Sequence, residues 1–126
     1  MSYKTDMGRV IGLGSAKQGA EHWFGERLKA VALIPLTLGF LCIVAPLIGE
    51  SYETVVAAFQ NPLKAILVIL FLLVTFKHLE EGLQVVIKDY VHGKAALLTL
   101  LIATKLGCWA FGLAGIFAVA KIAFSG

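Results

Sequence analysis

The chain has 126 residues, of which 59% are hydrophobic and 15% are charged, and its formal net charge is +3. A water-soluble domain of this size has too little interior to bury so much apolar surface, and a disordered chain is far more polar. The basic residues mostly flank long apolar blocks, which indicates an integral membrane protein and gives no reason to expect nucleic-acid binding.

Residues 1–27 precede the first apolar block. This stretch has the features of neither a cleavable signal peptide nor a transit sequence, so we expect it to be a cytoplasmic lead-in. Its run GLGSAKQG lacks a full nucleotide-binding fingerprint and follows no predicted strand. We therefore interpret this run as a flexible lead-in to the first span.

Three apolar blocks predict membrane-spanning helices over residues 28–49, 62–88 and 95–124. At about 1.5 Å per residue, each helix is long enough to cross a hydrocarbon core of about 30 Å. The predicted fold class is all-α, with three transmembrane helices in one membrane-anchor domain, 1–126.

Basic residues are distributed unequally between the predicted loops. Those before or at the start of the first span are Lys4, Arg9, Lys17, Arg27 and Lys29. Lys88 and Lys94 flank the second loop, whereas residues 50–61 contain Glu50 and Glu53 but no Lys or Arg. The positive-inside rule then predicts a cytoplasmic N-terminus and a periplasmic C-terminus, in a bacterial cytoplasmic membrane.

The second predicted helix contains the residues that best indicate a site. His78 and Gly82 are one helical turn apart, so a flat group such as a porphyrin can approach the imidazole beside the missing side chain. Asp89 and Tyr90 lie at the predicted interface, where they can hydrogen-bond a polar headgroup entering from the lipid. Ionisable residues inside a bilayer usually mark sites. The alternatives are a structural hydrogen bond for His78 and an interfacial anchor for Asp89 and Tyr90.

Other ionisable residues lie inside the second and third predicted helices. Lys77 and Glu81 are four residues apart, so a local ion pair is expected. Lys105 lies about 16 Å into the third helix, at a depth similar to that of Glu80 and Glu81. We expect Lys105 to pair with Glu81, since an unpaired charge there would be poorly tolerated.

The spacing His78-x3-Gly82-x6-Asp89-Tyr90 resembles the second helix of the hydrophobic membrane anchor subunit of succinate dehydrogenase (complex II). The stretch GLGSAKQGAEHWFGERLKAVALIPL is similar to that subunit's lead into its first helix, in the form found in alphaproteobacterial members. The matching positions in this stretch are Trp23, Arg27, Ala30, Ala32, Leu33 and Pro35. The predicted topology, length and orientation are also similar.

The resemblance implies a membrane anchor of succinate:ubiquinone oxidoreductase, assembled with a flavoprotein, an iron–sulfur protein and a cytochrome b membrane subunit. It implies that His78 is an axial ligand of haem b, shared with that sister subunit, with Arg27 near a propionate and Gly82 beside the ring. Tyr90 would hydrogen-bond a carbonyl oxygen of ubiquinone, with Asp89 next to it. The dehydrogenase chemistry would belong to the partners, because this chain has no flavin or cluster motif.

Two features depart from the family pattern. Glu21 stands where relatives often have a second His, which weakens a propionate role for His22. Glu80 and Glu81 stand where relatives tend to have a basic residue, so we expect a more negative field and a lower haem midpoint potential. The alternative functions are a fumarate reductase anchor, a haem-free structural anchor and a small proton-conducting or transport subunit.

Overall fold

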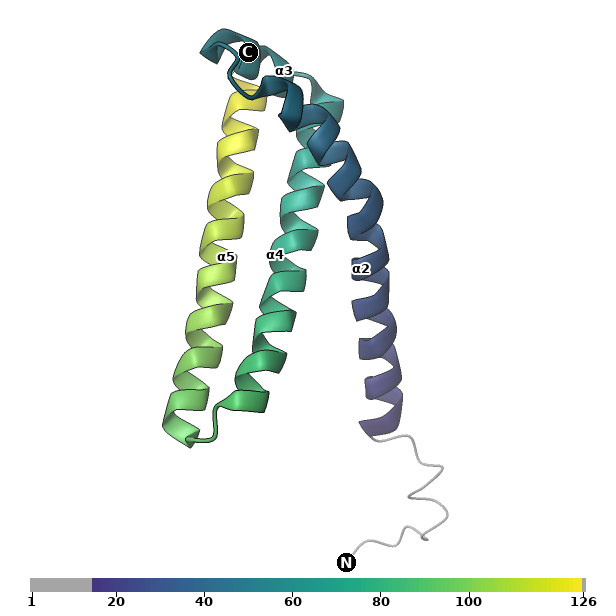
Figure 1. Ribbon diagram of the computed structural model, residues 1–126, viewed down its shortest axis with the longest axis vertical. Helices are drawn as coiled ribbons and strands as arrows, with labels where there is room; N and C mark the ends of the chain where they lie inside the picture. Colours follow the sequence, from purple (N-terminus) through teal and green to yellow (C-terminus); the bar gives the residue numbers. More distant parts are fainter. Residues whose placement is uncertain (1–14, 126) are drawn as a thin grey trace, which may run out of the picture.

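The structure, a computed structural model, describes residues 15–125 of the chain (Figure 1). Its elements are α2 (Ser15–Val44), the 3₁₀ helix η1 (Ala45–Leu47), α3 (Tyr52–Phe59), α4 (Pro62–Tyr90) and α5 (Lys94–Phe124). In this described part, three helices are long and apolar enough to cross a membrane, namely α2, α4 and α5. The predicted all-α architecture with three spans is therefore confirmed.

Helix α2 begins at Ser15, well before the start at Leu28 that hydropathy predicts. The second half of the lead-in is thus helical, and residues 1–14 of the lead-in lie outside the described part. Side-chain pairs one turn apart support part of this extension, over residues 22–27. His22 Nε2 lies 3.1 Å from Glu26 Oε1, and the Arg27 guanidinium lies 5.4 Å from the centre of the Trp23 ring. Such pairs stabilise a helix whose residues are too polar to register as a span.

The connection between α2 and α4 contains the short helix α3, which hydropathy does not predict. Gly49 has a φ of 84°, a left-handed conformation that favours glycine and turns the chain after η1. Ser51 Oγ then accepts a hydrogen bond from the Thr54 N–H at 3.3 Å and caps the N-terminus of α3. Helix α3 packs against α4 and α5 at the end of the molecule where the C-terminus lies (Figure 1).

Helix α4 lies between α2 and α5 and packs against both (Figure 1). On the α5 side, Gly112 brings the two backbones close, because a Cβ added there would lie 3.3 Å from Phe76 Cβ. On the α2 side, the rings of Phe40 and Phe71 are stacked with their centroids 4.2 Å apart. The start of α2 and the α4–α5 connection lie at the same end of the molecule, opposite α3 (Figure 1).

Most large apolar side chains of the described residues are exposed on the outer surfaces of the three long helices. The buried side chains are few and include Ala65, Val68 and Glu80. In water so large an apolar exterior would aggregate, whereas in a bilayer it contacts lipid tails or neighbouring membrane helices. The small core and apolar exterior are those of an integral membrane protein.

Candidate functional site

His78, Gly82 and Arg27 line one groove between α2 and α4. The groove has a volume of about 350 Å³, and we call it the α2–α4 groove. Its lining residues are Glu26, Arg27, Ala30, His78, Glu81, Gly82 and Val85. The α4 wall follows from helical geometry, because residues at i, i+4 and i+7 form a stripe along one face. Three residues that the sequence singles out for a single site are thus brought together from two helices.

The groove is open in front of the imidazole. A Cβ added at Gly82 would meet no atom within 4 Å, so nothing in the described chain fills the space beside His78. The His78 side chain is exposed on this chain. The Arg27 side chain is also exposed, and its guanidinium lies over the Trp23 ring. An imidazole and a guanidinium therefore line the same open groove, one suited to a metal ion and the other to an anion.

A metal ion at His78 would need ligands from outside the described residues. Within residues 15–125, no group of three or more His, Cys, Asp or Glu side chains is arranged to hold a metal ion. His78 is the only imidazole among the described residues that line the groove.

Glu81, which lines the groove, forms an ion pair with Lys29 of α2 that joins the two helices. The expected local pair is also present, with Lys77 Nζ 3.9 Å from Glu81 Oε1. The expected pair between Lys105 and Glu81 is wrong. Lys105 is exposed and forms no ion pair within the described part of the chain. The physical reason is that Glu81 lies on the α2 side of α4, where Lys29 already neutralises it.

Glu80 lies about 100° further round α4 from Glu81 and faces α5 instead. Its carboxylate is buried and contacts Lys77 Nζ at 3.3 Å and Gln84 Nε2 at 3.2 Å. The two consecutive glutamates therefore serve different helix interfaces.

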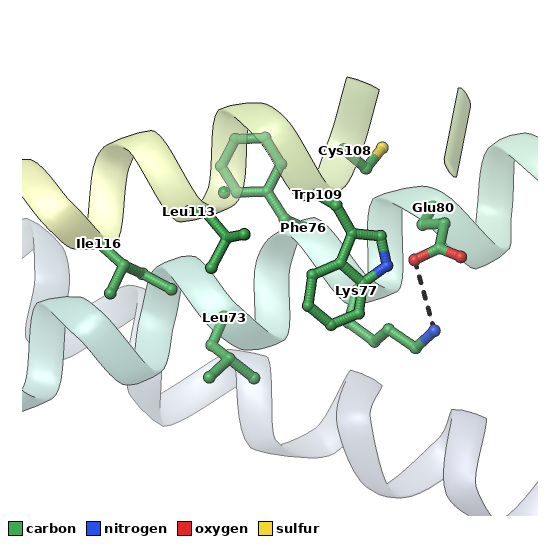
Figure 2. A pocket seen from close by; sticks show the side chains of 9 residues that line it. Leu73, Phe76, Lys77, Glu80, Cys108, Trp109, Leu113 and Ile116 are labelled. Carbon is green, nitrogen blue, oxygen red and sulfur yellow. Dashed lines mark hydrogen bonds and ion pairs between the residues drawn. The ribbon is translucent and has the colours of Figure 1, made fainter. Parts of the chain in front are cut away.

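Glu80 and Lys77 also lie at one end of a small apolar pocket between α4 and α5, with a volume of about 140 Å³ (Figure 2). The other lining residues are Leu73, Phe76, Cys108, Trp109, Gly112, Leu113 and Ile116. Sequence reasoning missed this pocket because its residues read as ordinary helix-packing positions. The sequence feature that comes nearest to indicating the pocket is Glu80, an acidic residue within a predicted span. Hydropathy does not show which neighbouring helix Glu80 faces.

Asp89 and Tyr90 lie at the end of α4, outside the α2–α4 groove. Tyr90 is about 18 Å along the helix axis from His78 and about a third of a turn around it, and its side chain is 79% exposed. Asp89 is exposed as well, and it continues the stripe of His78 with an offset of about 20°. The structure thus separates the sequence-predicted residues into a groove and an exposed helix end.

Comparisons with known proteins give the family. The family described as "Succinate dehydrogenase/Fumarate reductase transmembrane subunit" matches residues 1–118. The succinate dehydrogenase hydrophobic membrane anchor subunit of Paracoccus denitrificans is 34% identical over 97% of this chain and 94% of that protein. Its counterpart in Rickettsia bellii is 27% identical over 82% of this chain and 83% of that protein. The membrane anchor subunit of Reclinomonas americana is 33% identical over 62% of this chain and 68% of that protein. No solved structure matches significantly.

The family match covers the first two membrane-spanning helices and most of the third, ending within α5. These helices agree with a multi-pass protein of the bacterial inner membrane, and the resemblance predicted from the sequence is confirmed. Anchors of this kind work alongside other succinate dehydrogenase subunits. The chain belongs to the succinate dehydrogenase/fumarate reductase transmembrane subunit family and is a membrane anchor subunit of succinate dehydrogenase.

Proposed function

We propose that this chain co-ligates haem b and contributes to the ubiquinone-reduction site of succinate:ubiquinone oxidoreductase. Its proposed partners are a flavoprotein, an iron–sulfur protein and a cytochrome b membrane subunit. The observation that carries the proposal is the convergence of His78, Arg27 and Gly82 on the α2–α4 groove. Succinate oxidation itself is assigned to the partners, and this chain supplies anchorage, one iron ligand and part of the quinone pocket.

The residues of the groove fit haem chemically. An imidazole is a common axial ligand of haem iron, and a guanidinium forms bidentate hydrogen bonds with a carboxylate such as a propionate. The open space at Gly82 admits a flat ring beside His78. When bound, haem would supply one-electron redox chemistry. His78 would hold the group, Arg27 would orient it, and the sister subunit would close the open side of the groove.

Tyr90 and Asp89 suit a quinone edge. Reduction of ubiquinone takes up two protons, and an exposed Tyr hydroxyl can donate a hydrogen bond to a quinone carbonyl oxygen. The Asp89 carboxylate beside it provides a polar route for protons from the aqueous phase. Since both side chains are exposed on this chain, the remaining walls of the pocket would come from neighbouring subunits.

The charge distribution supports a cytoplasmic location for this end of the molecule. Four basic residues, Arg27, Lys29, Lys88 and Lys94, lie towards the start of α2 and the α4–α5 connection, which are at the same end of the molecule. The α3 end has two basic residues in the described part of the chain, Lys64 and Lys121. The positive-inside rule then predicts that the end of α4 with Tyr90 faces the cytoplasm, where the soluble subunits would dock.

A reduced-minus-oxidised spectrum of the purified complex tests the haem assignment. We expect His78→Ala to abolish the b-type signal, because His78 is the only histidine among the described residues that line the groove. His92→Ala is the matched control, since His92 is an exposed histidine in the α4–α5 connection, and it should leave the spectrum unchanged. His78→Met retains a ligand that haem proteins use, so it should keep haem with a shifted potential. An unaltered signal in His78→Ala would contradict ligation by His78.

A further inference from the structure

Four charged side chains form a connected network beside the α2–α4 groove. Lys29 pairs with Glu81, Lys77 contacts both Glu81 and Glu80, and Gln84 donates to Glu80. We call Lys29, Lys77, Glu80 and Glu81 the charge network. It contains two ammonium and two carboxylate groups, so its formal charges cancel.

The two carboxylates of the network are the members most shielded from water. The side chains of Glu80 and Glu81 are 4% and 15% exposed, whereas those of Lys29 and Lys77 are 26% and 41% exposed. Charges buried this far are tolerated when each has a partner, and removing one partner leaves the other uncompensated. A single substitution that removes a charge from the network should therefore leave an unbalanced charge on a neighbouring side chain.

The pair between Lys29 and Glu81 differs from the rest because it joins two helices. Lys77, Glu80 and Gln84 all belong to α4, so their contacts do not depend on where α2 lies. Glu81 lines the groove together with His78, and Lys29 follows Arg27 by two residues on α2. One member of the interhelical pair therefore lines the groove beside the residues proposed to face the haem.

We propose that Lys29 and Glu81 are positioning residues for this groove. Their ion pair holds α2 against α4, so that Arg27 and His78 line the same space. It also cancels the charge of Glu81 next to the imidazole. This inference rests on the proposed haem role, and it replaces the expectation that Glu80 and Glu81 make the field more negative, because both carboxylates have cationic partners.

The first test does not involve haem. It asks whether the Lys29–Glu81 ion pair stabilises the contact between α2 and α4, and it measures the melting temperature of the detergent-solubilised complex. Lys29→Met and Glu81→Gln should each lower it, and the double variant should lose less than the sum of the single losses, since the second change removes an already unpaired group. Lys105→Met is the control, because Lys105 lies outside the network, and its effect should add to that of Glu81→Gln. If the losses in melting temperature for Lys29→Met and Glu81→Gln were additive, the proposal that this ion pair holds α2 against α4 would be overturned.

The second test measures the midpoint potential of the haem. A merely structural role of Lys29 and Glu81 would not shift this potential in opposite directions when one or the other charge is removed. Lys29→Met leaves an unbalanced anion that favours ferric haem, so the potential should fall. Glu81→Gln leaves an unbalanced cation, so the potential should rise. The double variant restores neutrality and should return towards the wild-type value, and Lys29→Arg should stay close to it.

The outcomes separate this inference from the proposed function. A haem-containing complex whose potential does not respond in opposite directions to Lys29→Met and Glu81→Gln would overturn the electrostatic role, while leaving haem ligation in place. A wild-type complex without a b-type spectrum would overturn the proposed haem function. The melting-temperature cycle would then still decide whether Lys29 and Glu81 hold α2 to α4.

Discussion

Tyr90 and Tyr52 are both 79% exposed, but they lie at opposite ends of the molecule. Tyr90 ends α4 next to Asp89, whereas Tyr52 begins α3. Because their exposure is equal, the two residues separate the effect of a particular location from the general effect of removing a tyrosine hydroxyl. They form a matched pair for testing the proposed quinone edge.

We expect Tyr90→Phe to slow electron transfer from succinate to ubiquinone by about two- to tenfold, because one hydrogen bond to the quinone, worth about 0.5–1.5 kcal/mol, is lost. Reduction of an artificial dye that accepts electrons from the soluble subunits should be unchanged. Tyr52→Phe is the control and should affect neither assay. Equal loss in both variants would argue against a quinone contact at Tyr90.

The groove residues could be identified from the sequence because each is unusual for its location. An imidazole and a glycine one turn apart in a span, and an arginine where the first span begins, are informative without knowledge of helix packing. Lys29 was missed as the partner of Glu81 because it is one of several basic residues near a span end. Its pairing depends on how closely α2 approaches α4, which neither hydropathy nor helical periodicity determines.

At the scale of the helices, glycines set the distance between α4 and α5. We expect Gly112→Val to destabilise the complex by about 1–3 kcal/mol, because the added atoms would press on Phe76 close to the α4 backbone. Gly107→Val is the control on the same helix, where a Cβ would meet no atom of the described chain within 4 Å. The β-branch penalty is common to both changes, so the difference in melting temperature reports the packing. Equal melting temperatures would contradict close packing at Gly112.

Hydropathy located the three spans because each must cross the bilayer with apolar side chains. It did not reveal the extension of α2 to Ser15 or the existence of α3. Both are helical for local reasons, through i,i+4 side-chain pairs in the first case and a serine cap in the second. Neither segment is apolar enough to register as part of a span, so a hydropathy profile treats both as loops.

On the scale of the whole molecule, the exposed groove and the exposed Tyr90 imply further chains. We expect mass spectrometry of the complex purified in mild detergent to find a flavoprotein, an iron–sulfur protein and a second membrane subunit with this chain. A tagged, unrelated inner-membrane protein purified in the same way controls for adventitious capture. Absence of the flavoprotein and iron–sulfur protein would contradict the proposed four-subunit assembly.

The two consecutive glutamates have a consequence for the rotation of α4 about its own axis. A helix surrounded by lipid and apolar neighbours gains little from presenting one apolar side rather than another, so hydrophobicity alone leaves its azimuth poorly specified. Glu80 is buried on the side of α4 that faces α5, where Lys77 and Gln84 of α4 contact it, and Glu81 pairs with Lys29 of α2. Turning α4 by one residue position, about 100°, would unpair the interhelical contact and carry Glu80 out of its buried location. The two consecutive glutamates thus fix the rotation of α4 about its axis. The direction in which His78 points is therefore set by its neighbours in sequence.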